Sequence, residues 1–250
     1  MTQHVLEVTD LAVRYGVLDA LHGVSLTARG GEITVVTGPN GAGKSSLLNA
    51  AYGAAPRRAG TVHVDGIDVS TLPSRARARL GIALVPQGRH IFPNMSVIDN
   101  LRIMADLVGA GAERIERELD RFPILRSRLN QPAGVLSGGE QQMLTVARAL
   151  LADVRVLLGD EMITGLAPVI VDQLMRLVAD LAATGVAVIL AEPSIEPILS
   201  YVSCGCVLLR GSVAARADSA AALAQQYEDA LQRGRGSAAA AAINVTTTHA

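Results

Sequence analysis

The chain has 250 residues and a formal net charge of −1, with 50% apolar, 18% charged and 2% aromatic residues. This balance is too apolar for a disordered protein, and the near-neutral charge argues against a nucleic-acid binder, which usually carries a basic excess. The apolar runs fall short of the roughly 18–20 residues that a membrane-spanning helix needs. The first ten residues contain Glu7 and Asp10 and no apolar signal core, so we expect a soluble, cytoplasmic chain.

The N-terminal third alternates short strands with one helix. Val5–Val13 and Leu21–Ala28 partly alternate polar and apolar residues, which predicts two antiparallel strands. Ile33–Thr37 predicts a compact buried strand that enters a glycine-rich turn, and Lys44–Tyr52 predicts a helix. Two further strands are expected at Thr61–Val64 and Leu80–Val85. Arg75, Arg77 and Arg79 precede the second of these and are expected to form a solvated face rather than a phosphate patch.

The rest of the chain is dominated by helical periodicity. From about Val97 to Leu129 the apolar residues recur at helical spacing. Beyond this block we expect helices at Gly138–Leu151, Pro168–Ala183 and Ser219–Leu231, and strands at Val154–Gly159, Val186–Ala191 and, as the last strand, Cys206–Leu209. Cys204 and Cys206 allow a strained disulfide or half of a metal site, but zinc would need two more ligands, so we expect reduced thiols on a strand.

Short apolar strands separated by helices predict an α/β fold with a mostly parallel sheet, to which the first strands add an antiparallel β subdomain. The helical block, about residues 88–152, lies between two buried strands and predicts an inserted helical subdomain. One domain is therefore expected over residues 1–233. Residues 234–250 contain a run of five alanines and are expected to form a disordered tail.

Residues 38–45, Gly-Pro-Asn-Gly-Ala-Gly-Lys-Ser, match the pattern G-x-x-x-x-G-K-[ST] between a buried strand and a helix. Glycines let successive backbone N–H groups turn around a phosphate, and the helix that follows presents its positive end. Lys44 is expected to reach the β- and γ-phosphates and the Ser45 hydroxyl to ligate Mg²⁺. The expected nucleotide-binding residues of this loop are Gly38, Pro39, Asn40, Gly41, Ala42, Gly43, Lys44, Ser45 and Ser46.

An acidic pair follows the apolar strand that begins near Val154. Asp160 is expected to orient Mg²⁺, directly or through water, and Glu161 to polarise an attacking water. Alone, such a pair at a strand end is often a solvated turn. Together with the phosphate-binding motif it predicts a nucleoside triphosphatase with a P-loop core.

Residues 136–142, Leu-Ser-Gly-Gly-Glu-Gln-Gln, resemble the signature motif of ATP-binding-cassette (ABC) ATPases. The backbone N–H groups at this predicted helix start form a second anion site. The residues expected to contact nucleotide there are Ser137, Gly138, Gly139 and Glu140. The resemblance covers roughly residues 4–215 and implies a head-to-tail dimer, with ATP between the Lys44 loop of one subunit and the Ser137 loop of the other. Kinases and GTPases with a similar phosphate loop lack this motif.

The resemblance implies roles for two more residues. Tyr15 stands where an aromatic ring stacks on adenine, and Gln87 matches the glutamine that contacts Mg²⁺ and the attacking water and faces the membrane partner. The expected catalytic residues are Lys44, Gln87 and Glu161, and the expected metal ligands are Ser45, Gln87 and Asp160. ATP and Mg²⁺ are the expected cofactors.

The segments Pro86–Pro93, Ser137–Met143 and Gly165–Pro168 resemble the ATPases of branched-chain amino-acid importers, and urea and amide importers share much of this pattern. The chain is similar to the smaller of the two ATPase subunits. The resemblance implies a location at the cytoplasmic face of the membrane. The implied partners are a second ABC ATPase in a homo- or heterodimer, two membrane permeases and, indirectly, a solute-binding protein. Ile91 and Phe92 are expected either to receive a permease helix or to pack in the core.

Three positions depart from the family pattern. Met162 follows Glu161 where proline is usual, and Gly159 interrupts the strand where a branched residue is usual. Pro193 falls at the position of the switch histidine, which this branch often replaces by a polar residue such as glutamine. A one-residue shift would offer Glu192 or Ser194 instead.

Proline has neither a side-chain donor nor an N–H, so Pro193 cannot donate a hydrogen bond to the γ-phosphate or the attacking water. Loss of one transition-state hydrogen bond costs about 10²–10³ in rate. We therefore hypothesise normal ATP binding with slow hydrolysis, so that a sister ATPase supplies more of the turnover. The alternatives are ordinary activity and a regulatory subunit that no longer turns over.

Overall fold

The computed structural model describes residues 3–246, with side chains described as far as Arg233. The strands are β1 (Val5–Tyr15), β2 (Leu18–Arg29), β3 (Ile33–Thr37), β4 (Arg57–Val64), β5 (Ile67–Asp68), β6 (Ile82–Val85), β7 (Val156–Asp160), β8 (Ala187–Glu192), β9 (Cys204–Leu209) and β10 (Ser212–Ala217). The helices are α1 (Lys44–Tyr52), α2 (Ser74–Arg79), α3 (Val97–Val108), α4 (Ala112–Arg121), α5 (Pro123–Ser127), α6 (Gly138–Ala149), α7 (Pro168–Ala183) and α8 (Ala220–Thr246), with short 3₁₀ segments η1 (Ala133–Val135) and η2 (Glu196–Tyr201). Among residues 3–246, no helix has the length and apolar character needed to cross a bilayer.

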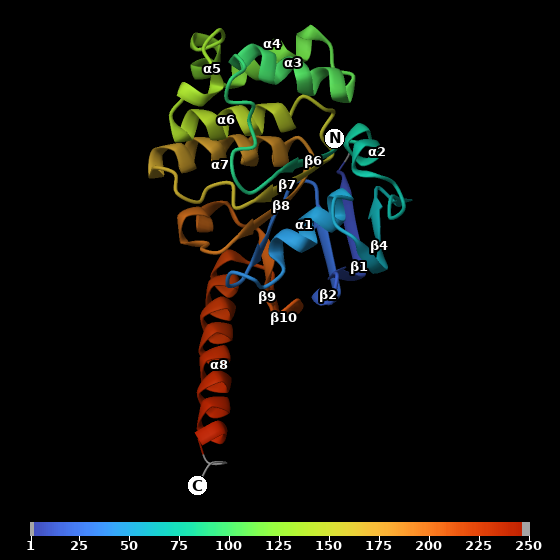
Figure 1. Ribbon diagram of the computed structural model, residues 1–250, viewed down its shortest axis with the longest axis vertical. Coiled ribbons are helices and arrows are strands. Elements are labelled where there is room, and N and C mark those ends of the chain that lie inside the picture. The colour runs from blue at the N-terminus through green and yellow to red at the C-terminus, as the bar shows by residue number, and fades with distance from the viewer. Residues whose placement is uncertain (1–2, 247–250) are drawn as a thin grey trace.

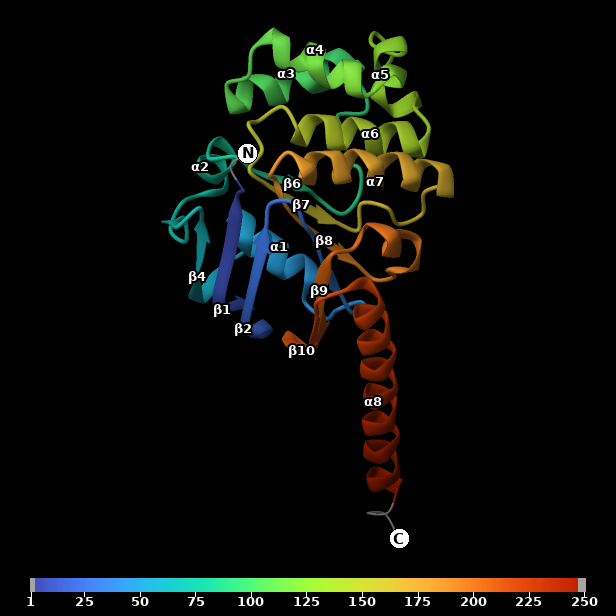
Figure 2. The same cartoon turned by 180° about the vertical axis from the view of Figure 1, so that it is seen from behind.

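Two sheets and the helices between and around them form the layers of the molecule. The main sheet has the strand order β10-β9-β3-β8-β7-β6 and is parallel except for β10, which pairs antiparallel with β9. The second sheet, β2-β1-β4-β5, is antiparallel. Helix α1 lies between the sheets, and α6 and α7 cover the other face of the main sheet (Figures 1 and 2). The predicted α/β class, with a mostly parallel P-loop core, an antiparallel β subdomain and an inserted helical subdomain, is confirmed.

The central strands of the main sheet are buried on both faces. Every residue of β3, β7 and β8 is buried, as expected for parallel strands covered by helices on each side. Alternate residues of β3 enter two different cores: Val36 packs with α1 and the second sheet, and Val35 packs with α6 and α7. These strands form the centre of the apolar core.

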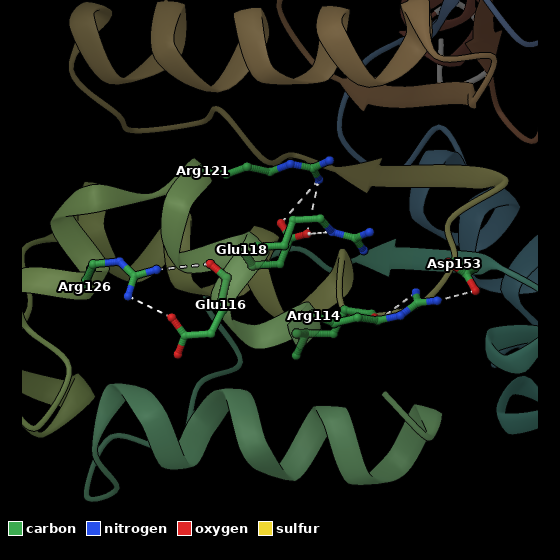
Figure 3. A network of polar contacts seen from close by, with 8 residues as sticks. Arg114, Glu116, Glu118, Arg121, Arg126 and Asp153 are labelled. Atoms are coloured by element: carbon green, nitrogen blue, oxygen red, sulfur yellow. Dashed lines mark hydrogen bonds and ion pairs between the residues drawn. The ribbon is translucent and has the colours of Figure 1, made fainter. Parts of the chain in front are cut away.

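Ion pairs link α4 to α5 and connect α4 to the segment before β7 (Figure 3). Glu118 of α4 is fully buried and accepts a hydrogen bond from Arg121 at 3.2 Å; burial raises the pKa of this carboxyl although the guanidinium opposes the shift. Arg114 of the same helix pairs with Asp153, which lies just before β7. Arg126 of α5 reaches back to α4 carboxylates. Of these ion pairs, only Arg114–Asp153 therefore leaves the two helices. The apolar residues of α3–α5 that belong to the same core as α6 and α7 include Leu101, Leu119 and Leu125.

Strand β10 was not predicted, and the expectation that Cys206–Leu209 is the last strand is wrong. In β10 the residues alternate between exposed and half-buried, so this edge strand lacks the apolar run that marks a central strand. Cys204 and Cys206 lie in β9 as free thiols, as predicted.

Arg77 corrects the expectation of a fully solvated basic face. Its side chain is buried, and the guanidinium donates to the carbonyls of Ala50 and Ala51 at 2.9 and 2.7 Å and to Ser70 at 2.8 Å. The last carbonyls of a helix lack intrahelical partners, and arginine offers five donors to satisfy them. Arg77 therefore ties α2 to the C-terminal end of α1, the helix that starts at the phosphate loop.

The tail is the second correction. A helix was expected only to Leu231 and disorder from residue 234, but α8 continues to Thr246 and extends away from the body of the molecule (Figure 1). The run of five alanines accounts for this, because alanine has the highest intrinsic helix propensity. Residues 247–250, the end of the predicted tail, lie outside the described residues.

Candidate nucleotide-binding site

The phosphate loop, residues 38–43, connects β3 to α1 and is fitted closely between two other strands. A Cβ added to Gly38 would lie 2.2 Å from the carbonyl oxygen of Leu208, and one added to Gly43 would lie 2.7 Å from that of Ala20. Gly43 also has a positive φ of 104°. Glycine is required at both positions because the loop backbone touches β9 on one side and β2 on the other.

Lys44, the only lysine of the chain, lies at the first position of α1 and points back into the loop. It is 4% exposed, and its Nζ donates to the carbonyl oxygens of Gly38 at 2.7 Å and Pro39 at 3.2 Å. Burial lowers the pKa of Lys44, while the nearby carboxylates of Glu161 and Asp160 raise it. The loop therefore holds a desolvated ammonium among backbone carbonyls, which suits it to an anionic ligand.

Asp160, the last residue of β7, meets the start of α1. The Ser45 hydroxyl donates to Asp160 Oδ1 at 3.0 Å, and burial raises the pKa of Asp160. Oxygen ligands of this kind fit Mg²⁺, which keeps several waters and binds through one or two protein oxygens and substrate phosphates. Within the part of the chain with described side chains, no three His, Cys, Asp or Glu residues cluster as a metal site.

Gln87 and Glu161 come together across 74 residues of sequence. Gln87 Nε2 donates to Glu161 Oε2 at 2.9 Å. Glu161 has a left-handed backbone, with φ of 47°, and its N–H donates to the carbonyl of Ala191 at 2.9 Å. The strand end of β8 thereby supports the turn that aims this carboxylate, a group that can accept a proton from a water molecule.

One cavity of about 700 Å³ collects most of the predicted residues. The predicted residues that line this cavity are Tyr15, Asn40, Gly41, Gly43, Lys44, Ser45, Ser46, Gln87 and Glu161. The lining also includes residues that the sequence did not indicate, namely Leu18, Asp19, Ala20, His22, Arg210 and Gly211. The first four lie on β2, whose start at Leu18 precedes the predicted strand, which began at Leu21. Arg210 and Gly211 belong to no recognised motif. A cavity of about 650 Å³ between α4, α5 and α7 contains none of the predicted residues.

The second predicted anion site stands apart from this cavity. Ser137 caps α6: its Oγ accepts from the Glu140 N–H at 3.3 Å, and Glu140 accepts from the Ser137 N–H at 2.7 Å. This reciprocal capping box explains the serine and glutamate locally. Ser137, Gly138, Gly139 and Glu140 do not line the cavity at the phosphate loop, so the single chain does not join its two predicted anion sites. Arg89 lies between Gln87 and α6 and donates to Gln141 at 3.0 Å.

The switch loop, residues 193–195, follows β8, and none of its residues lines the cavity. The carbonyl of Pro193 accepts a hydrogen bond from the Tyr227 hydroxyl of α8 at 3.0 Å. Glu192 is fully buried and accepts from the Ile163 N–H at 3.3 Å, while its Oε2 has no partner among the described residues. Burial, reinforced by Glu161, raises the pKa of Glu192 to about 8. Neither Glu192 nor Ser194 takes the place of the missing switch residue in the cavity.

Two of the unusual residues beside the site fit one another. A Cβ at Gly159 would lie 2.7 Å from Met162 Sδ and 2.8 Å from Leu190 Cδ2. Met162 is 1% exposed and fills the space that a branched side chain at residue 159 would take. The two departures from the family pattern, at Gly159 and Met162, therefore compensate for one another in packing. We call this pair a packing exchange.

Comparison with known proteins gives a family match over the region of the site. Residues 21–164 match the model described as ABC transporter. The chain is 36% identical over 221 residues to the high-affinity branched-chain amino acid transport ATP-binding protein BraG of Pseudomonas aeruginosa, covering 88% of this chain and 94% of BraG. It is 37% identical over 216 residues to the probable branched-chain amino acid transport ATP-binding protein LivF of Archaeoglobus fulgidus, covering 84% and 90%.

An export protein is about as similar. The lipopolysaccharide export system ATP-binding protein LptB of Escherichia coli is 36% identical over 217 residues, covering 84% of this chain and 89% of LptB. Among solved structures, a nucleotide-free ATP-binding cassette from an ABC transporter matches with a TM-score of 0.80 and 25% identity, covering 87% of this chain and 92% of the other. A dimeric ATP-binding cassette bound to ADP and Pi matches in fold with a TM-score of 0.77 and 23% identity, covering 85% and 98%.

Proposed function

Because the chain belongs to the ABC transporter family, whose ATPase domains bind and hydrolyse ATP, we propose that it is the ATPase subunit of an importer. The proposed solute is a branched-chain amino acid or a related small solute such as urea or an amide. The names of BraG and LivF favour the amino acid. LptB, at similar identity, serves an export system, so the direction of transport belongs to the proposal.

The observation that carries the proposal is the convergence of two hydrogen-bonded pairs on the cavity of Lys44. Ser45 with Asp160, and Gln87 with Glu161, come from three separate segments, and Ser45, Gln87 and Glu161 line the cavity. In the proposed reaction Lys44 neutralises phosphate charge, and Ser45, Asp160 and Gln87 hold Mg²⁺. Glu161 accepts a proton from the attacking water. Bound Mg²⁺ would supply charge neutralisation on the phosphate oxygens.

The remaining nucleotide contacts are proposed to come from a second ABC ATPase, homologous or identical. ABC ATPases form dimers, as in the cassette bound to ADP and Pi. Because Ser137–Glu140 lies outside the cavity of its own chain, a head-to-tail dimer would let this anion site face the phosphate loop of the partner. Tyr15, 43% exposed at the end of β1, is free to stack on adenine.

The permease contact is proposed at the loop after Gln87. Phe92 is 42% exposed, and the Arg148 guanidinium lies 5.0 Å from the centre of its ring, whereas Ile91 packs against the core. An exposed aromatic ring held by an arginine can receive a short helix from a membrane partner. Two permeases and, through them, a solute-binding protein would place the chain at the cytoplasmic face of the membrane.

A second candidate is a nucleotide-binding subunit with little hydrolysis that regulates a sister ATPase. The placement of Pro193 outside the cavity favours it, whereas the mutual packing of Gly159 and Met162 removes two of the three arguments for a damaged site. Nucleotide-dependent dimerisation without hydrolysis would support this candidate. Steady turnover that depends on this chain in the assembled complex would exclude it.

The test is solute uptake into vesicles that contain the complete complex, with radiolabelled leucine, urea and acetamide as separate probes. We expect ATP-dependent uptake of leucine that is lost in Lys44→Ala and kept in Arg79→Ala, which removes an exposed charge on α2. ATP-dependent uptake of none of the three solutes by the wild-type complex would contradict the proposed substrate class.

A further inference from the structure

The turn between β9 and β10 brings a second cation to the nucleotide cavity. Leu209 pairs with Ser212, so the connection is the two-residue loop Arg210-Gly211. Arg210 lines the cavity together with Lys44. Its side chain is exposed and makes no hydrogen bond or ion pair with the side chains or backbone described for residues 3–233.

Backbone contacts hold this turn firmly against the site. The Gly211 N–H donates to the carbonyl of Ala42 in the phosphate loop at 2.9 Å, and the Gly211 carbonyl accepts from the His22 N–H of β2 at 2.9 Å. A Cβ at Gly211 would lie 2.6 Å from the carbonyl oxygen of Ala20. The turn, β2 and the phosphate loop thus form one backbone assembly, and Arg210 keeps its place beside the loop.

Arginine is an unusual choice at this point of the turn. Arg210 and Gly211 both have positive φ, 48° and 76°, the geometry that favours Asn-Gly or Asp-Gly because asparagine and aspartate tolerate it best. The same chain contains such a turn: Asp65-Gly66 joins β4 and β5 with φ of 51° and 78°. A long side chain kept in a strained conformation at a ligand cavity points to a functional constraint.

The charges around the cavity leave Arg210 available for a ligand. Asp19, the acidic residue on the β2 side, is already held by Arg14 through two hydrogen bonds of 2.6 Å each. Glu161 accepts from Gln87. Lys44 is the only lysine of the chain, and Lys44 and Arg210 are the two permanently charged cations among the described residues that line the cavity.

We propose that Arg210 is a nucleotide-binding residue whose guanidinium contacts a phosphate oxygen of bound ATP. This inference rests on the proposed ATP site. It adds a contact from a hairpin outside the motifs that define the site. Arginine suits the role because its planar fork presents several donors to phosphate oxygens and always carries its charge.

The experiment measures nucleotide binding by calorimetry with Mg²⁺ chelated, so that hydrolysis does not interfere. The variants are Arg210→Asn, Arg210→Lys and the control Arg79→Asn, which removes an exposed arginine from α2. Asparagine suits the positive φ of residue 210, so Arg210→Asn is expected to keep or raise the melting temperature. The probes are ATP, ADP and adenosine.

We expect Arg210→Asn to raise the Kd of ATP and of ADP about fivefold, as for one exposed charge-assisted contact, and to leave adenosine unchanged. Arg210→Lys should recover part of the loss, and Arg79→Asn should match the wild type. Wild-type affinity of Arg210→Asn for ATP would overturn the inference, and so would an equal loss for adenosine. A wild-type chain that binds no ATP would instead overturn the proposed function and the inference with it.

Discussion

The phosphate loop and the switch loop follow neighbouring strands of the same sheet but are equipped differently. β3 and β8 are paired so that their last residues, Thr37 and Glu192, lie side by side. The phosphate loop leads into Lys44 and Ser45, which line the cavity. The switch loop presents Pro193, whose only polar group, its carbonyl, is occupied by Tyr227. Adjacent strands bring both loops to one edge of the sheet, but only the phosphate loop lines the cavity, so we expect binding and hydrolysis to be separable in this chain.

The largest effect is expected from a variant that should keep ATP binding and lose hydrolysis. Glu161→Gln keeps the hydrogen-bonding shape but removes the base, so turnover should fall about 10²–10⁴-fold while ATP binding persists. Steady-state hydrolysis and equilibrium binding of ATP check this together. Hydrolysis at the wild-type rate in Glu161→Gln would assign the base to another residue.

Lys44→Ala should impair ATP binding at the phosphate loop, because it removes the cation of that loop. The Kd of ATP should rise about 100-fold, the worth of one or two charged hydrogen bonds. Amine-reactive labelling offers a direct readout in the wild type, since Lys44 is the sole lysine. Saturating ATP should protect it from the reagent; equal labelling with and without ATP would contradict the placement of Lys44 on the phosphates.

The switch-loop side should show its own pH dependence through Glu192. Its pKa of about 8 in the folded chain lies above the ordinary value of 4.5, so the folded state holds a proton that the unfolded state releases. This contribution to stability is complete below about pH 4.5 and is lost as the pH rises through 8. Between pH 5.5 and 8.5, the free energy of unfolding of Glu192→Gln should therefore rise by a few kcal/mol relative to that of the wild type. Urea unfolding of both chains measures this difference. Parallel pH profiles of the two chains would contradict this.

The packing exchange at β7 predicts a smaller effect. Gly159→Val would press on Met162 and Leu190 and should lower the free energy of unfolding by about 1–3 kcal/mol. Met162→Ala in the same chain should restore part of the loss, because the thioether is the closest obstacle. Additive losses in the double variant would show that the two residues do not share the space.

Most of the site was predictable because its residues occur in contiguous motifs with a physical purpose. Gly38 and Gly43 stand where backbone must approach backbone, and Lys44 opens the helix that follows. Ile33–Thr37 and Pro168–Ala183 were placed with their observed bounds, since a short β-branched run before a glycine-rich turn marks the first and an N-terminal proline the second. Local sequence suffices where the chemistry is local.

The unpredicted parts depend on tertiary contacts. Arg210 reaches the cavity only because β10 turns back along β9, and β10 itself alternates too weakly in burial to be recognised. Arg77 is buried because the end of α1 needs donors, which no pattern within α2 shows. The fit of Gly159 to Met162 likewise exists only once β7 and the turn after it are folded.

The most direct test of the account is Pro193→His, measured for both ATP turnover and ATP affinity. A histidine at this position supplies the side-chain donor that the switch loop lacks, while the phosphate loop is untouched. We expect a turnover at least tenfold higher than that of the wild type, part of the about 10²–10³-fold that one transition-state hydrogen bond contributes, with the Kd of ATP unchanged within about twofold. Unchanged turnover in a folded Pro193→His chain that still binds ATP would contradict the separation of binding from hydrolysis at these two loops.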